Sequence, residues 1–364
     1  GGMKAIMWTS VLQTPVLIIG SLVILVVGLD KVGGWAEVER INDANMHLIR
    51  SASDAEFPWP GIVFGSFIIG FWYWCTDQYI VQRVLSAKGI KEARRGTMFA
   101  GYLKLLPVFI FLVPGMIAYA LNVKGIISYE SADQAFPTLV AELLPAGVKG
   151  IVIGGLVAAL MSSLASLFNS SATLFTIDFY KKFKPESSEK HLLKVGRIAT
   201  IVIVVLGLLW IPVMSLIADV LYEYLQSVQS LIAPGIAAVF LLGLCSKRIT
   251  PTAGFVGLVS GFVLGMIRLV LLPFKDDLTG SSFAWITTMN WLYYCILLFV
   301  VVVAIMIVVS MFTKQADEEQ LKGLTFSSLD KATMKEVAAG LDKWDYIHTA
   351  GIIGITAFIY YRFW

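Results

Sequence analysis

The sequence predicts an all-α polytopic membrane protein, and three observations lead to that class. The chain is 57% hydrophobic and only 15% charged, with a mean hydropathy of +0.79, whereas a soluble domain has about 45–50% apolar and about 25% charged residues. The apolar residues come in blocks of the length, about 20 residues, that crosses a bilayer as a helix. Lys and Arg gather in alternate loops between these blocks, as they do in membrane proteins of fixed orientation.

About nine segments are apolar and long enough to span a membrane. Several exceed the required length, which indicates tilt or extension beyond the bilayer. The expected spans are roughly 3–29, 58–85, 97–121, 149–180, 192–218, 224–244, 252–274, 286–312 and 346–363.

The basic loops follow the second, fourth, sixth and eighth expected spans. Because Lys and Arg mark cytoplasmic loops, we expect Gly1 near the cytoplasm, loop 30–57 outside and Trp364 at the outer side of a cell (plasma or inner) membrane. The chain opens on Gly1 directly before an apolar run and without an initiator Met. We interpret it as a piece of a longer protein.

Several function classes find no support in the composition. A formal charge of +3 is too small to suggest a nucleic-acid partner. The three cysteines have no paired spacing, and the three histidines are scattered, so neither a metal cluster nor a disulfide framework is indicated. No span offers a His-led catalytic group, and we therefore do not expect an enzyme. The oligomeric state stays open.

Aromatic and polar residues meet inside the second expected span. Tyr73 and Asp77 are four residues apart and share a helical face, with Trp74 one step round. Rings beside polar groups suit a sugar, which has apolar C–H faces and a rim of hydroxyls. The same residues could instead form an interfacial aromatic belt, with Asp77 paired to Arg83.

Two further polar residues lie inside expected spans. Lys104 could extend to the cytoplasmic surface or donate into a polar cavity. Gln226 offers both a donor and an acceptor and precedes Pro234, which can free backbone groups beside a cavity. Bonding between helices is an equal alternative for Gln226.

Small residues line one face of the fourth expected span, where Ala159, Ser162, Ser163 and Ser166 lie at i, i+3, i+4 and i+7. Small residues on one face favour close helix packing. Hydroxyls and a carbonyl one turn earlier also suit sodium, a hard cation that prefers oxygen ligands.

Four long stretches together resemble the sodium/glucose cotransporters of the solute:sodium symporter family, in order and in spacing. The opening GGMKAIMWTSVLQT is similar to another helix of that family, and the likeness spans nearly the whole chain. The four stretches are WYWCTDQYIVQR, YLKLLPVFIFLVPGMIA, MSSLASLFNSSATLFTIDFY and YLQSVQSLIAPGIAAVFLLG.

The resemblance implies a LeuT-type inverted-repeat transporter fold with a site near the bilayer midplane. Residues 1–29 would be the last helix of a first repeat that is mostly missing, and 30–57 an extracellular loop. Residues 58–244 would form the second repeat with five helices. Residues 245–364 would hold three peripheral helices and a cytoplasmic loop at about 313–345.

The resemblance also implies roles for individual residues. Tyr73 matches an inner gate over the sugar, and Trp74, Lys104 and Gln226 match sugar-binding residues. Gly70 stands where some members have a polar residue, so that contact is not expected here. The family's sodium ligands correspond to Ala159 by its carbonyl and to Ser162 and Ser163 by their hydroxyls.

Two departures bear on the ion count. Members that move two sodium ions have Asp where this chain has Ser10 and Thr where it has Ala165. We therefore expect Na+-coupled symport of a neutral, glucose- or galactose-like monosaccharide, with one sodium ion per sugar. The alternatives are another solute, such as myo-inositol, or a sugar sensor that binds without coupling.

Overall fold

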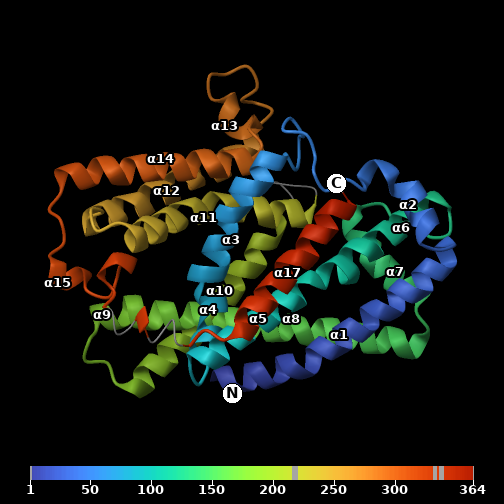
Figure 1. The fold of residues 1–364 in the computed structure, drawn as a ribbon, viewed down its shortest axis with the longest axis horizontal. Helices are drawn as coiled ribbons and strands as arrows, with labels where there is room; N and C mark the ends of the chain where they lie inside the picture. The colour runs from blue at the N-terminus through green and yellow to red at the C-terminus, as the bar shows by residue number, and fades with distance from the viewer. Residues whose placement is uncertain (1, 215–219, 331–333, 336–339, 364) are drawn as a thin grey trace. The chain divides into compact units, whose positions relative to one another are not determined.

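The computed structural model describes residues 2–214, 220–330, 334–335 and 340–363 (Figure 1). Within these residues the regular elements are all helices, which confirms the all-α class. The chain divides into two compact units. Unit 1 holds residues 1–48, 96–213 and 352–363, and unit 2 holds 49–95 and 214–351 with Trp364.

Unit 1 is built around three long helices and several short ones. Helices α5 and α17 contribute residues to both units. Its elements are α1 (Gly2–Val32), α2 (Trp35–Asn42), η1 (Asp43–Asn45), α5 (Ile90–Leu105), η4 (Val108–Leu112), α6 (Val113–Val123), η5 (Ala132–Gln134), α7 (Ala135–Leu143), α8 (Ala146–Leu174), η6 (Phe175–Tyr180), α9 (Lys181–Phe183), α10 (Glu189–Met214) and the end of α17 (Lys343–Arg362).

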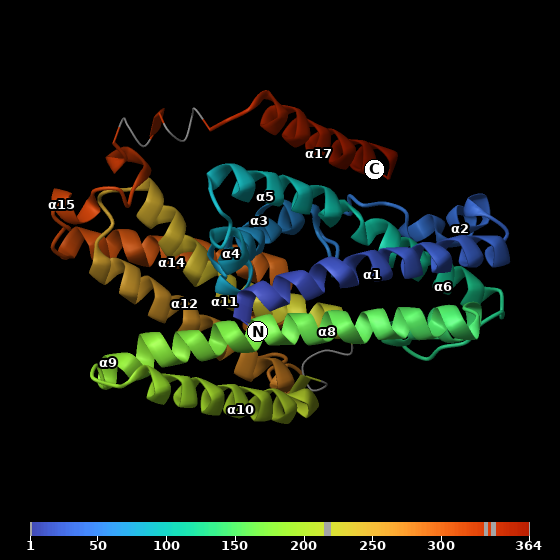
Figure 2. The same ribbon diagram turned by 90° about the horizontal axis from the view of Figure 1, so that it is seen from below.

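Helices α1 and α8 lie side by side and run antiparallel (Figure 2). Small residues allow this approach: a Cβ on Gly20 would lie 2.5 Å from Val152 Cγ2, and one on Gly155 would lie 2.7 Å from Val16 Cγ1. Close backbone approach through glycine is how apolar helices associate in lipid, where the hydrophobic effect gives no drive. The buried core of unit 1 is shared by α1, α2, α6, α7 and α8.

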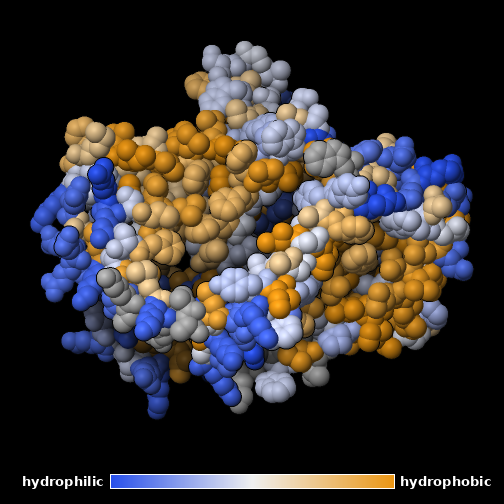
Figure 3. Space-filling model, in the orientation of Figure 1, coloured by the Kyte–Doolittle hydropathy of each residue, from blue (hydrophilic) through white to orange (hydrophobic). Residues whose placement is uncertain are grey.

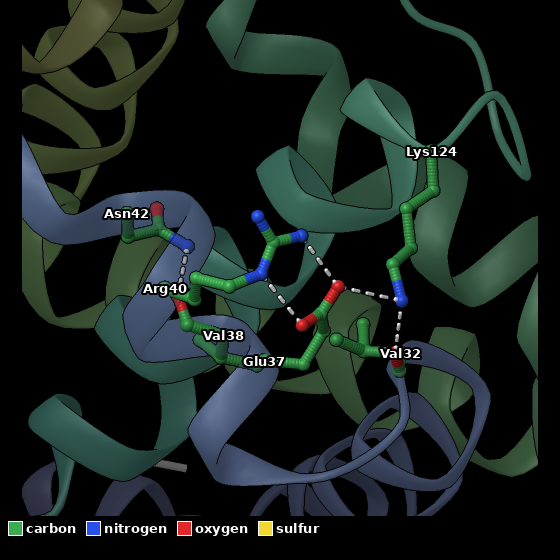
Figure 4. A network of polar contacts seen from close by, with 6 residues as sticks. All are labelled: Val32, Glu37, Val38, Arg40, Asn42 and Lys124. Atoms are coloured by element: carbon green, nitrogen blue, oxygen red, sulfur yellow. Dashed lines mark hydrogen bonds and ion pairs between the residues drawn. The ribbon is translucent and has the colours of Figure 1, made fainter.

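A polar cluster holds the short helix α2 against the ends of α1 and α6 (Figure 4). Lys124 donates to the Val32 carbonyl and lies 3.1 Å from Glu37 Oε1. Arg40 binds the same carboxylate through two nitrogens, at 2.9 and 2.8 Å. Both cations favour the ionised carboxylate, and the hydrogen bonds from Arg40 and then Lys124 lower the pKa of Glu37 to about 2.

The end of α17 meets the same side of unit 1. Arg362 pairs with Glu39 on α2, and the Leu48 amide donates to the Phe363 carbonyl at 2.7 Å. The alternation of basic loops predicts that segment 30–57, segment 122–148 and the chain's end share one side of the membrane. Within unit 1, the structure brings residues 32–48 together with Lys124 and with residues 362–363.

Unit 2 is a bundle of three long helices with a broken helix packed on it. Its elements are η2 (Gly61–Gly65), α3 (Ser66–Phe71), η3 (Trp72–Thr76), α4 (Gln78–Leu85), α11 (Leu221–Cys245), α12 (Pro251–Leu271), η7 (Leu272–Phe274), α13 (Ala284–Thr288), α14 (Trp291–Phe312), α15 (Glu318–Leu321), η8 (Phe326–Ser328) and the start of α17.

A glycine row on α12 sets the spacing of this bundle, and α11, α12 and α14 lie side by side in Figure 1. A Cβ on Gly265 would lie 2.3 Å from the Leu231 carbonyl oxygen of α11, and one on Gly261 would lie 2.7 Å from Gly235 Cα. Real Cβ contacts are longer, so only glycine permits this approach of the two backbones.

The two ends of unit 2 are closed by different bonds. At one end, Asn290 donates to the carbonyls of Ala55 and Glu56, and Tyr293 donates to that of Ala52. At the other, Thr250 and Thr313 join through their hydroxyls at 2.6 Å. The loop before α14 thus lies with segment 49–57, as the predicted alternation requires.

Seven helices in the described part of the chain are long and apolar enough to cross a membrane. They are Thr14–Val32, Ile90–Val123, Ala146–Phe183, Glu189–Met214, Leu221–Cys245, Pro251–Phe274 and Trp291–Phe312.

The other two expected spans differ. Segment 58–85 is interrupted and contains only a short apolar helix, Gly61–Thr76, and 346–363 lies in α17, which is helical but not among the seven. Residues 215–218 of the expected span 192–218 lie outside the described residues. Orange atoms over α1 and α6 in Figure 3 mark an apolar surface that suits lipid.

Candidate functional site

The expected second span breaks at Asp77, three residues after the aromatic run ends at Trp74. Residues Trp72–Thr76 form a π-helical turn, in which the Asp77 amide donates to the Trp72 carbonyl at 3.1 Å. The Thr76 hydroxyl donates to the same carbonyl at 2.7 Å. Asp77 then takes an extended conformation (φ −72, ψ 119), and its carboxylate accepts the Tyr79 amide at 2.9 Å.

Asp77 is therefore the N-cap of α4, a role that Asp fills readily because its oxygen satisfies an open amide of the first turn. The expectation that Asp77 pairs with Arg83 did not include this role. A capping residue followed by an apolar helical pattern is the signal that predicts such a helix start.

Tyr73 and Trp74 lie on the π-helical turn before the break. Their rings meet edge to face, with centroids 5.1 Å apart, and Trp72 contacts Tyr73 in a similar way at 6.1 Å. Tyr73 is half-buried and Trp74 is 46% exposed. The aromatic edges and the Tyr73 hydroxyl thus form a partly open surface of the kind that stacks on a sugar ring.

Gln226 belongs to the same unit, near the start of α11. Its amide nitrogen donates to the Tyr222 hydroxyl at 3.1 Å, one turn earlier on the same helix. The amide oxygen keeps its two lone pairs as an acceptor. The π-helical turn also packs on α11, so unit 2 supplies Tyr73, Trp74 and Gln226 from elements in mutual contact.

Lys104 lies in unit 1, in the last turn of α5. The helix ends at Leu105 because Pro107 removes an amide donor and disfavours helix at the residue before it, and the π-helical turn η4 follows at Val108. The Lys104 side chain is exposed, which places its ammonium group where a polar ligand or water can reach it.

The small face of α8 is a row of buried hydroxyls. Ser162, Ser166 and Ser170 are 9%, 0% and 4% exposed, whereas Ser163 is exposed and Ala159 is half-buried. The spacing of four residues makes one continuous face on a regular helix. Of the two serines expected to bind sodium, only Ser162 lies on this buried face.

The partner of this helix is α1. The close pairs Gly20–Val152 and Val16–Gly155 define an antiparallel register, and its continuation along the backbone places Ser162 level with Ser10. Ala165 lies about one turn further along. Ser10 and Ala165, on which the expected ion count rests, thus belong to one stretch of the α1–α8 pair.

The expected site residues divide between the two units. Tyr73, Trp74 and Gln226 belong to unit 2, and Lys104, Ala159, Ser162 and Ser163 to unit 1.

Arg268 and Thr176 are two of the buried polar residues that the sequence did not predict. Arg268 on α12 is 4% exposed, donates to the Met289 carbonyl at 2.6 Å and lies 4.2 Å from the Tyr294 ring centre. Thr176 in η6 is 5% exposed, and its hydroxyl has no protein partner. An arginine inside an apolar span is a signal that could have found Arg268; nothing in the sequence marks Thr176.

The long apolar helices, the broken aromatic helix and the buried hydroxyl row together define a multi-pass membrane protein built around polar positions inside its spans. Residues 1–261 match the model of the sodium:solute symporter family. The chain belongs to that family, whose members are transporters and not enzymes.

Similar proteins include several named cotransporters. Sodium/glucose cotransporter 1 of Sus scrofa is 37% identical over 90% of this chain and 56% of its own length. Sodium/glucose cotransporter 4 of Homo sapiens is 37% identical over 90% and 53%. Sodium/myo-inositol cotransporter 2 of Homo sapiens is 36% identical over 93% and 56%. The chain therefore spans about half the length of these relatives.

Proposed function

We propose that the full-length protein couples the inward movement of Na+ to that of a neutral monosaccharide, of glucose or galactose type, by alternating access. The observation that carries this proposal is the aromatic pair Tyr73–Trp74 at the helix break, in a chain that belongs to a sodium-coupled family. Transporter sites are typically formed where a spanning helix is discontinuous.

In this proposal the sugar contacts four side chains. Trp74 supplies an aromatic surface for stacking, Gln226 donates and accepts hydrogen bonds, and Lys104 donates to hydroxyls. Tyr73 covers the sugar from the cytoplasmic side and moves aside as the inner gate.

Sodium is the co-transported ion and binds to α8. Ala159 contributes its carbonyl oxygen, and Ser162 and Ser163 contribute hydroxyl oxygens, the neutral ligands that a hard and releasable cation requires. Ser10 supplies no carboxylate and Ala165 supplies no hydroxyl, so we propose one sodium ion per sugar. Coupling requires that sodium bind the sugar-competent state more tightly than the other state.

The second candidate solute is myo-inositol. It is favoured by the similarity to sodium/myo-inositol cotransporter 2, which nearly equals that to the glucose cotransporters. Both solutes are neutral and rich in hydroxyls, so the same donors and acceptors serve either one.

The test uses the full-length protein in proteoliposomes. Uptake of labelled glucose, galactose and myo-inositol is followed under an inward sodium gradient, with potassium as control. Accumulation in sodium only, with a Hill coefficient for sodium near one, is the expected result. A coefficient near two contradicts the argument from Ser10 and Ala165. Binding of sugar without accumulation in any gradient contradicts symport and identifies a sensor.

A further inference from the structure

The hairpin that joins α8 to α10 lies at the end of unit 1 away from α2 (Figure 2). It runs through η6 and α9 and a short loop into the first turns of α10. Five lysines on it are all exposed: Lys181, Lys182, Lys184, Lys190 and Lys194. Transport of a neutral solute does not require so many exposed cations at the end of a spanning helix.

An aromatic column leads along η6 and α9 to these lysines. Phe175, Phe179 and Phe183 are spaced four residues apart and are 46%, 61% and 82% exposed. The rings of Phe175 and Phe179 stack with centroids 6.4 Å apart. The exposed fraction thus increases from Phe175 to Phe183. In the sequence, Phe183 lies among Lys181, Lys182 and Lys184.

One side-chain bond joins the two arms of the hairpin. The Tyr180 hydroxyl lies 2.8 Å from His191 Nε2, and the two rings are 5.6 Å apart. Tyr180 directly precedes Lys181, and His191 directly follows Lys190. The bond therefore brings the lysines of α9 next to those of α10.

The positive charge of the hairpin is not cancelled within the protein. Residues 175–194 contain five lysines and three acidic residues, the latter being Asp178, Glu186 and Glu189, so a net positive charge remains. The ion pairs found among the described residues include none of the five lysines. A cluster of four to eight basic residues at the end of a spanning helix attracts anionic lipid headgroups.

We infer that the α8–α10 hairpin, residues 175–194, is a binding site for anionic phospholipid headgroups. Phe183 enters the boundary between headgroups and acyl chains, as exposed aromatic residues do at membrane interfaces. The lysine ammonium groups contact the lipid phosphates, with their stems lying along the bilayer surface. The inference does not depend on which solute the protein carries.

The test compares a variant that lacks three positive charges of the hairpin with a variant that lacks three positive charges elsewhere in the protein. The hairpin variant of the full-length protein is K181Q/K182Q/K184Q. The matched control is K88Q/K91Q/K247Q, which alters exposed lysines of unit 2 and removes the same charge. Both are titrated in detergent with phosphatidylglycerol or phosphatidylcholine, and the thermal midpoint reports binding.

Phosphatidylglycerol should stabilise the parent protein and the control more than phosphatidylcholine does. The hairpin variant should bind phosphatidylglycerol roughly a hundred-fold more weakly, since each basic residue near an anionic surface contributes about five-fold. A second variant, F183S, keeps every charge and should weaken binding by a smaller factor, because it removes only the apolar contact.

Three results would overturn the inference. Equal losses in the hairpin and control variants would show an effect of net charge alone. Unchanged phosphatidylglycerol binding in the hairpin variant would place the lipid elsewhere. Stabilisation by inorganic phosphate equal to that by phosphatidylglycerol would show a free-anion site without lipid.

Discussion

Substitution of Gly265 by alanine tests the packing of α11 on α12. The new Cβ would lie 2.3 Å from the Leu231 carbonyl oxygen, an atom that moves only if the whole helix moves. Ordinary contact needs about 3.5 Å or more, so the two helices must separate by about 1 Å. Overpacking of this kind costs about 1–3 kcal/mol.

The matched control is Gly254→Ala on the same helix. A Cβ there would lie 3.8 Å from Val239 Cγ1, which is ordinary contact. Both substitutions gain helix propensity, up to about 1 kcal/mol. This gain cancels in the comparison, so Gly265→Ala should be less stable than Gly254→Ala by about 1–3 kcal/mol.

A third variant grades the effect. Gly257→Ala would place its Cβ 2.6 Å from Met306 Cγ, but a methionine side chain can adjust. Its loss of stability should lie between those of the other two variants. The assay is unfolding of the full-length purified protein in one fixed detergent–lipid mixture. Equal stability of Gly265→Ala and Gly254→Ala would refute the glycine-controlled spacing.

Four further outcomes are expected. Because the pKa of Glu37 is lowered to about 2, its contribution to stability should be complete above pH 4.5 and lost as pH falls toward 2; Glu37→Gln should remove that pH dependence of the thermal midpoint. Asp77→Ala should destabilise the protein by about 1 kcal/mol while Asp77→Asn keeps the cap, and equal losses would contradict the capping role. Ser162→Ala should strongly raise the sodium concentration required for uptake; unchanged sodium dependence would remove Ser162 from the ion site. Gln226→Ala should weaken sugar binding by the worth of a buried hydrogen bond, about 0.5–1.5 kcal/mol, and unaltered binding would place the sugar elsewhere.

The sequence was sufficient for the membrane class, because apolar length and the alternation of basic loops follow directly from the bilayer. It was not sufficient for the interruption of the second span. The apolar pattern runs on through both sides of Asp77, and only the local bonds of Thr76, Asp77 and Tyr79 decide where the helix stops. Such competition between side-chain and backbone bonds is invisible to a hydropathy pattern.

The row of small residues on α8 shows the same limit. From the sequence alone, Ser162 and Ser163 are equally good candidates for sodium ligands, because the pattern does not say which face of α8 is buried. Burial distinguishes them only after α8 has packed against its neighbours, and then Ser162, Ser166 and Ser170 share the buried face. Tertiary packing, which periodicity cannot supply, decides which hydroxyls leave the lipid.

Irregular backbone accompanies three of the four groups proposed to bind ligand. In the described part of the chain, Tyr73 and Trp74 lie within one π-helical turn, Lys104 stands just before a second, and the hydroxyl row of α8 runs into a third. A π-helical turn leaves carbonyls without their usual partners and is frequent at functional positions. In a membrane, such carbonyls are tolerated only where protein or a polar cavity satisfies them. Gln226 lies on regular α-helix instead, so its contact with the solute must come from the side chain alone. Gln226→Ala therefore removes the whole of the proposed contact, which makes it a sharp test of the solute site.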